Sequence, residues 1–198
     1  TPRDLDYTIA HEIGHNWFYG ILASNEREHP FLDEGINSYY EDRYMEEYYP
    51  NSSISNLGIL SKFTGGFDDN ELIYQYMGRS YLDQFPDQQS ENFSLINYGT
   101  DVYTKSAKLF EDAEEYLGLI DFDRIMKKYY ESWKFKHPYP EDLEKIFTEN
   151  SNKNMDWLFH YFLTTNKKMD YSIRAIKHQN DSVEILLKNS GQVPAPFQ

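Results

Sequence analysis

The chain begins TPRDLDYTIAHEIGHNWFYG, residues 1–20. Apolar residues recur in this stretch at helical spacing: Leu5, Ile9, Ile13, Trp17. The pattern predicts a helix over residues 3–19, with Thr1 and Pro2 as cap and first turn. It contains His11-Glu12-Ile13-Gly14-His15, and residues four apart share a helix face, so both imidazoles can reach one metal ion. The carboxylate of Glu12 can then hydrogen-bond a water molecule at the metal without binding the metal itself.

A catalytic zinc site needs a third protein ligand and an open fourth position. Glu34 follows His15 after 18 intervening residues, near the start of a second helix predicted over residues 31–48. A helix–loop–helix of this size can return that carboxylate to the two histidines, which gives a ligand set typical of hydrolytic zinc. Four nearby residues compete for the same place, and we interpret the three loop residues among them as solvated: Glu26, Glu28, His29, Asp33. Helical spacing does not separate Asp33 from Glu34.

The composition limits the class of protein. The 198 residues are 39% hydrophobic and 17% aromatic, too apolar for a disordered chain and enough for one domain, or for one domain and the beginning of a second. There is no cysteine, which excludes thiolate ligands and disulfides. The 33 acidic against 19 basic residues argue against nucleic acid as a partner. We expect neither a transmembrane segment nor a signal peptide in this chain.

Periodicity predicts further helices downstream. They cover residues 72–77, 81–85, 100–117, 122–133, 140–147 and 157–162, with Thr100 or Asp101 as the cap of the third and Gly118 at its end. From about residue 169 the apolar residues alternate with polar ones, which predicts two strands of a hairpin around a turn at residues 178–181. The predicted fold class is mainly α, with a helical domain over residues 1–168 and a β domain that begins at 169–198.

The zinc-site pattern resembles a known family. His11-Glu12-x-x-His15-x-Trp17, eighteen residues, then Leu32-Asp33-Glu34-Gly35 resembles the zinc aminopeptidases of the aminopeptidase N family, a gluzincin group. Asn16 stands where that family commonly has Gln. The resemblance implies a thermolysin-like helical catalytic domain followed by the start of a β-sandwich. It also implies one zinc ion per chain, bound by His11, His15 and Glu34, with Glu12 as the general base for a zinc-activated water molecule.

Two more site residues follow from the resemblance. Tyr103-Thr104-Lys105-Ser106 is similar to the family's Tyr-x-Lys-Gly segment, whose tyrosine stabilises the oxyanion, although Ser106 replaces the glycine and Tyr98 is a nearby competitor. Glu41 lies seven residues beyond Glu34, two helical turns along one face. In the family this position is similar to the carboxylate that accepts a hydrogen bond from a ligand histidine, and an exposed acid in a charged run is the alternative.

The implied function is zinc-dependent hydrolysis of peptide substrates, with removal of N-terminal residues. Three alternatives stay open: a thermolysin-like endopeptidase, a leukotriene-hydrolase-type enzyme and a non-catalytic module that binds zinc. The family's N-terminal β domain and its Gly-x-Met-Glu-Asn segment, which binds the substrate amine, do not occur in these residues. We therefore expect the chain to be a segment of a longer polypeptide whose other domains are its partners. By itself it should bind zinc but hydrolyse peptides poorly.

Overall fold

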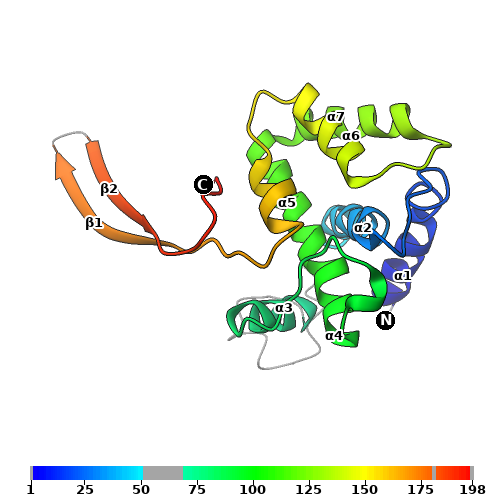
Figure 1. The fold of residues 1–198 in the computed structure, drawn as a ribbon, viewed down its shortest axis with the longest axis horizontal. Helices are drawn as coiled ribbons and strands as arrows, with labels where there is room; N and C mark the ends of the chain where they lie inside the picture. The colour runs from blue at the N-terminus through cyan, green and yellow to red at the C-terminus, as the bar shows by residue number, and fades with distance from the viewer. Residues whose placement is uncertain (1, 51–68, 180–181, 197–198) are drawn as a thin grey trace.

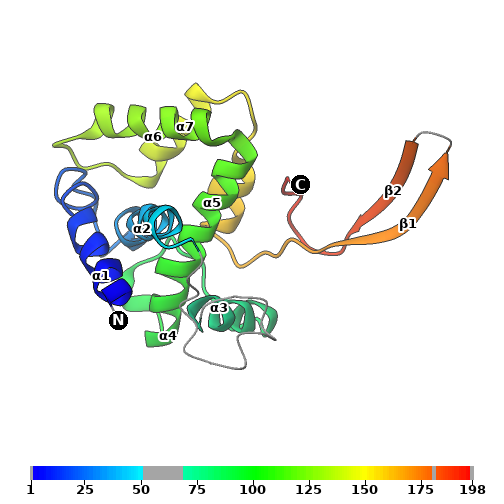
Figure 2. The same ribbon diagram turned by 180° about the vertical axis from the view of Figure 1, so that it is seen from behind.

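The computed structural model describes residues 2–50, 69–179 and 182–196. A helical body carries a two-stranded hairpin that projects from it as an arm, seen from opposite sides in Figures 1 and 2. The helices are α1 Pro2–Gly14, α2 Glu34–Tyr48, α3 Asp69–Arg79, α4 Leu95–Asn97, α5 Ser106–Leu117, α6 Leu119–Trp133 and α7 Pro140–Asn150. The described residues also include two π-helical segments (η4 Tyr98–Lys105, η5 Trp157–Phe162) and two 3-10 turns (η1 Pro30–Leu32, η3 Ser90–Asn92). The mainly helical fold class is confirmed.

The hydrophobic core lies among α2, α5, α6, α7 and η5. Each of α5, α6 and α7 repeats apolar residues every three or four positions, so that one face of each helix is buried. The largest fully buried side chains among the described residues are aromatic and aliphatic: Leu22, Phe31, Leu32, Ile36, Tyr39, Phe110, Phe122, Ile125, Tyr129, Leu143, Phe147, Leu158. α2 contacts α1, η4 and α5, and is therefore the element through which the core reaches the predicted site.

α1 contains no buried residue, unlike α2, α5, α6 and α7. The apolar stripe that runs along α1 and on to Trp17 just beyond it consists of residues that are 44 to 61% exposed: Leu5, Ile9, Ile13, Trp17. The helix ends at Gly14, so the predicted end at about Tyr19 is wrong. Beyond Gly14 the backbone curls into turns, and Tyr19 adopts a φ of 89°, which an α-helix cannot contain. The apolar spacing continues to Trp17 through these turns, which explains why periodicity alone overran the end.

The helix that carries Tyr103 begins earlier than predicted. The Ser94 hydroxyl accepts a hydrogen bond from the Asn97 amide and caps α4, which continues through η4 into α5. Thr100 and Asp101 are therefore not caps: the Thr100 hydroxyl donates to the Ile96 carbonyl, and Asp101 accepts from the Gln84 amide. The end at Leu117 is confirmed, with Gly118 at a φ of 90°.

The loop that follows α3 contains a second wrong prediction. Residues 82–85, expected as part of a short helix over 81–85, lie outside any helix. Their polar groups are bound by other elements, as when the Gln84 amide donates to Asp101. Tertiary hydrogen bonds therefore outweigh the weak local preference. The helix expected over 72–77 is present within the longer α3.

The predicted hairpin is present as β1 Tyr171–Gln179 and β2 Ser182–Asn189, an antiparallel pair. Residues 178 and 179, expected in the turn, belong to β1, while 180–181 lie outside the described residues. A bulge between Ile173 and Ala175 shifts the alternation by one residue, so that Ile173 and Ile176 share a face with their partners Leu187 and Ile185. Most of this apolar face is exposed. Whether it begins a β-sandwich domain at residue 169 stays a prediction.

Among the described residues, every helix is too short or too polar to span a bilayer.

Candidate metal centre

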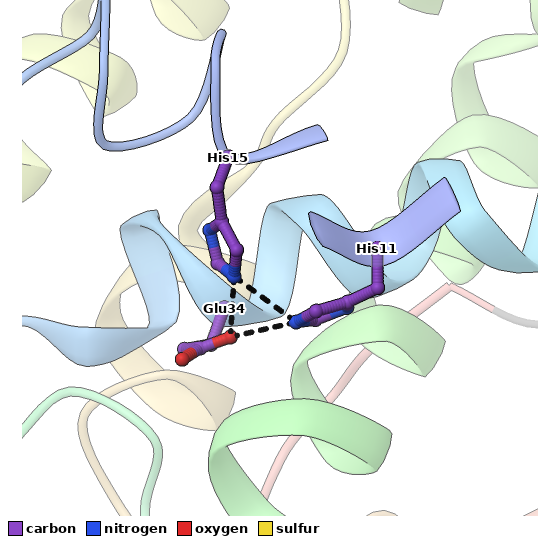
Figure 3. Close-up of side chains that lie close together, drawn as sticks. All are labelled: His11, His15 and Glu34. Carbon is purple, nitrogen blue, oxygen red and sulfur yellow. Dashed lines mark hydrogen bonds and ion pairs between the residues drawn. The ribbon is translucent and has the colours of Figure 1, made fainter. Parts of the chain in front are cut away.

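Three side chains from α1 and α2 converge on one point. His11 projects from α1, His15 directly follows the end of that helix at Gly14, and Glu34 lies in the first turn of α2; Figure 3 shows their nitrogen and oxygen atoms facing one another. His11 Nε2 lies 3.1 Å from Glu34 Oε2 and 3.1 Å from His15 Nε2, while His15 Nε2 lies 3.4 Å from Glu34 Oε2. The predicted ligand residues are therefore brought together, and they are the group of His and carboxylate side chains found close enough to hold a metal ion within the described ranges.

The size of this triangle can be compared with what zinc requires. Ligand atoms about 2.05 Å from a tetrahedral zinc ion stand about 3.3 Å apart. The edges observed here, 3.1 to 3.4 Å, match that separation closely. Two imidazole nitrogens and one carboxylate oxygen are also a donor set that suits zinc and leaves its fourth position open. The residues present therefore fit a zinc ion.

Each histidine has a buried carboxylate behind it. His11 Nδ1 lies 3.1 Å from Glu41 Oε2, and His15 Nδ1 lies 2.8 Å from Asp33 Oδ1. Glu41 is 3% exposed and Asp33 is 2% exposed. Such a partner fixes the ring orientation and the tautomer, so that Nε2 of each ring is the nitrogen left for a metal. The arrangement is nearly symmetric about the two histidines.

The carboxylates shape the electrostatics of the site. Hydrogen bonds to Glu34 and Glu41 raise the pKa of His11 to about 10, so the metal-free ring is protonated at neutral pH. Burial raises the pKa of Asp33 to about 7, although the charge of His15 and its hydrogen bond to Asp33 act to lower that pKa. Burial likewise raises the pKa of Glu41. Acidic groups crowded around two imidazoles favour occupation by a dication, which would displace the proton from His11.

Tyr103 lies beside the ligand cluster. Its ring stacks on His11 with centroids 5.8 Å apart, and its hydroxyl interacts with the Glu34 carboxylate. Burial would raise the pKa of Glu34, but hydrogen bonds from His11 and Tyr103 outweigh burial and lower it. Burial and the same carboxylate raise the pKa of Tyr103, which keeps its phenol protonated and able to donate. Tyr98, the other candidate for the oxyanion-stabilising tyrosine, packs edge-on against the Tyr103 ring, with ring centroids 6.0 Å apart.

Two glycines allow α1, α2 and the start of α5 to approach one another closely. A Cβ on Gly14 would lie 1.8 Å from Asn37 Oδ1, and Asn37 Nδ2 donates to the His11 carbonyl at 2.8 Å. A Cβ on Gly35 would lie 2.4 Å from Ser106 Cβ. The two glycines therefore let α2 pack directly on α1 at one side and on the start of α5 at the other.

The remaining predicted residues lie apart from the triangle. Glu12 is exposed on α1 next to His11, and none of the described residues forms a hydrogen bond or ion pair with it. His29 Nδ1 bonds Asp87 Oδ1 at 2.5 Å, which raises the pKa of His29, and His29 does not belong to the group of close side chains that could hold a metal ion among the described residues. Glu26 and Glu28 are exposed, as expected of solvated loop residues.

Two supporting residues were not assigned from the sequence. Asp33 was considered only as a rival ligand, whereas it lies on the outer nitrogen of His15. Asn37 was not considered at all. A signal for Asn37 did exist, because Glu34, Asn37 and Glu41 follow one another at positions i, i+3 and i+7 along one helix face. No comparable signal places Asp33, which precedes the helix.

Comparison with known proteins adds the family. Residues 2–162 match the model of the peptidase family M1 domain, a range that includes every predicted site residue. Aminopeptidase M1-D of Oryza sativa subsp. japonica is 22% identical over 190 residues, covering 93% of this chain and 20% of the rice protein. Probable aminopeptidase 1 of Sulfurisphaera tokodaii is 22% identical over 176 residues, covering 89% of this chain and 21% of its own length. The chain thus spans about a fifth of the length of these relatives.

Solved structures show the same fold. An M1 zinc metallopeptidase variant from Deinococcus radiodurans, bound to a Tyr-Ser-Ala substrate, superimposes with a TM-score of 0.55 at 14% identity, covering 80% of this chain and 32% of that one. Legionella pneumophila aminopeptidase A, in complex with aspartic acid, gives a TM-score of 0.56 at 16% identity and covers 85% and 18%. The helical architecture is therefore that of M1 peptidase structures.

Proposed function

The chain belongs to peptidase family M1, and we propose that it carries the zinc site of an aminopeptidase that removes N-terminal residues from peptides. One observation carries the proposal. Within an M1 domain, His11, His15 and Glu34 place three ligand atoms in a triangle of the size that tetrahedral zinc requires. The names of the relatives support the aminopeptidase activity over an endopeptidase.

His11, His15 and Glu34 would hold one zinc ion, and Glu41 and Asp33 would orient the two imidazoles. Bound zinc acidifies a water molecule, from a pKa of about 15.7 to about 7, and polarises the carbonyl of the scissile amide. The chain's own part in the chemistry then falls to Glu12 and Tyr103.

Glu12 acts as the general base and then as the general acid. Its carboxylate is exposed and stands one residue from His11, so it is free to take a proton from the attacking water molecule. The same group returns that proton to the nitrogen of the leaving amine, which converts a poor leaving group into a neutral one. A purely structural metal site has no use for such a base.

Tyr103 donates to the oxyanion. Its phenol stays protonated beside the Glu34 carboxylate, so a donor is already in place when negative charge develops on the carbonyl oxygen of the substrate. Removing one such donor typically lowers kcat by about 10²–10³.

Two substitutions in the full-length polypeptide test these roles with an aminoacyl chromogenic substrate. Glu12→Gln should lower kcat by about 10²–10⁴ while zinc remains bound, because the base is not a ligand. Tyr103→Phe should lower kcat by about 10²–10³ with zinc also retained. His29→Ala is the matched histidine control and should alter neither quantity. Unchanged turnover in the Glu12 variant would refute the proposed mechanism, and an inactive wild-type protein with full zinc occupancy would favour the binding-module alternative.

Two exposed apolar surfaces support the expectation of partner domains in the same polypeptide. One is the stripe of α1, and the other is the hairpin face that contains Ile173, Ile176 and Ile185. Because the relatives are about five times longer than this chain, other parts of such a polypeptide would cover both surfaces. The isolated chain should accordingly bind zinc yet turn over peptides much more slowly than the full-length protein. Equal activity of the two would contradict this expectation.

A further inference from the structure

A buried ion cluster lies beside η4, apart from the three ligand atoms. Asp83, in the loop after α3, is 4% exposed. Its Oδ2 accepts a hydrogen bond of 2.9 Å from Lys105 Nζ and a second, shorter one from Lys168 Nζ. Lys105 Nζ also donates to the Gln84 carbonyl at 2.8 Å. Apolar side chains of similar volume could replace these buried charged groups without loss of folding stability. A contribution to stability therefore does not explain why the ion cluster is present.

The cluster attaches to η4 at two points that flank Tyr103. The first point is Lys105. The second is Asp101, which is 0% exposed and whose Oδ2 accepts a hydrogen bond of 2.7 Å from the Gln84 amide. Asp101 and Lys105 are four positions apart and therefore share a helical face. Tyr103 lies midway between them and points to the opposite side, where its ring stacks on His11. The loop at Asp83 and Gln84 thus holds the back of the segment whose front carries Tyr103.

The same carboxylate is joined to the base of the hairpin. The Lys168 carbonyl accepts hydrogen bonds from the backbone amides of Gln192 and Val193, at 2.7 and 3.3 Å. Val193 is 0% exposed. Lys168 therefore lies just before β1 and is hydrogen-bonded to the segment that follows β2. Asn166 Nδ2 adds a hydrogen bond to the Asp83 carbonyl at 2.8 Å.

We propose that Asp83 is a positioning residue for Tyr103. Through Lys105 it fixes the face of η4 opposite the phenol, and through Lys168 it ties that face to the base of the hairpin. The inference rests on the proposed function in one respect, namely that the Tyr103 hydroxyl contributes to turnover. A displacement of about 1 Å in a group that stabilises charge is enough to lower a rate severalfold or more.

A double-mutant cycle in the full-length polypeptide tests the proposal. Asp83→Asn should lower kcat about tenfold with KM unchanged, and it should cause no further loss in the Tyr103→Phe background. Lys168→Met, which leaves the Asp83–Lys105 pair intact, should give a smaller loss with the same dependence on Tyr103. Asp123→Asn, which removes the partner of Arg43 elsewhere in the body, is the matched control and should leave kcat unchanged in both backgrounds. Equal losses with and without the Tyr103 hydroxyl would overturn the proposal.

A spectroscopic readout separates this proposal from the proposed function. With 3-fluorotyrosine at position 103, the fluorine resonance should shift or broaden in Asp83→Asn and in Lys168→Met, but not in Asp123→Asn. If Asp83→Asn does not fold, Lys168→Met decides. An unchanged resonance in the folded variants would overturn the positioning role whatever the kinetics show. A shifted resonance together with full activity of Tyr103→Phe would instead support the positioning role and refute the catalytic role of Tyr103.

Discussion

α1 and α2 both contribute to the candidate metal centre, but they are held in the molecule by different means. α2 has seven buried residues, and two of them, Ile36 and Tyr39, belong to the hydrophobic core. α1 buries none, and its apolar stripe faces outward. The contacts of α1 with α2 include polar contacts, such as His11 with Glu41 and Asn37 with the His11 carbonyl. Hydrophobic packing therefore positions one wall of the site, and the hydrogen bonds of the site itself position the other.

From this difference we expect the proposed zinc binding and the docking of α1 to be linked. The side chains that orient the two histidines also join α1 to α2, so a change at these contacts should alter zinc affinity more than global stability. A change in the hydrophobic core should alter global stability more than zinc affinity. The predictions below test that contrast, beginning with the largest expected effect.

Truncation in the core should be costly, whereas truncation on α1 should not. Phe122 is 0% exposed and packs against Tyr39 and Phe147. Phe122→Ala should lower the free energy of unfolding by about 3–5 kcal/mol. Ile9→Ala, at a side chain 44% exposed, should lower it by about 0.5 kcal/mol or less. Urea unfolding of both variants measures the contrast, and similar losses would show that α1 is packed as tightly as the core.

A methyl group at the α1–α2 contact should separate the two helices. Gly14→Ala places a Cβ 1.8 Å from Asn37 Oδ1, an overlap that should cost about 3 kcal/mol, at the upper end of overpacking effects. Because the overlap displaces α1, zinc affinity should fall as well. Gly99→Ala is the matched control, since no atom lies within 4 Å of its added Cβ. Unchanged zinc affinity in Gly14→Ala would refute the link between docking and metal binding.

The two outer carboxylates should have comparable effects. Glu41→Gln and Asp33→Asn each remove one charge behind a ligand histidine, so each should weaken zinc binding about 10- to 100-fold, or about 1.4–2.8 kcal/mol. Competition with a chelator measures the affinity. A weakening in only one of the two variants would show that the symmetric arrangement around His11 and His15 is not functional.

The last prediction concerns the pH dependence of folding stability and rests on Asp101. Burial raises the pKa of Asp101 to about 6, above the value of about 3.9 for an unfolded aspartate. Between pH 4 and 6 the folded chain therefore binds more protons at this group than the unfolded chain, and stability falls as the pH rises. For one proton the slope is at most about 1.4 kcal/mol per pH unit. Asp101→Asn should remove this decline in stability between pH 4 and 6 and leave the zinc stoichiometry unchanged. Urea unfolding at several pH values measures the decline.

Much of this architecture could be predicted from the sequence, because one-sided burial leaves a periodic trace. Helices α5 to α7, the hairpin and the convergence of His11, His15 and Glu34 follow from spacing and family resemblance. The errors occur where tertiary contacts override local signals. Gly14 ends α1 although the apolar spacing runs on, and Asp101 binds the loop at Gln84 instead of capping a helix. Spacing cannot show on which side of His15 the carboxylate of Asp33 lies, because that depends on how the chain enters α2.

The central claim is that His11, His15 and Glu34 bind one zinc ion, and a calorimetric zinc titration of the metal-free protein tests it most directly. The wild-type chain should take up one zinc ion per molecule, and His29→Ala should do the same because His29 is bonded to Asp87 away from the triangle. His15→Ala should lose this uptake. Absence of zinc binding in the wild type, or undiminished binding in His15→Ala, would contradict the claim.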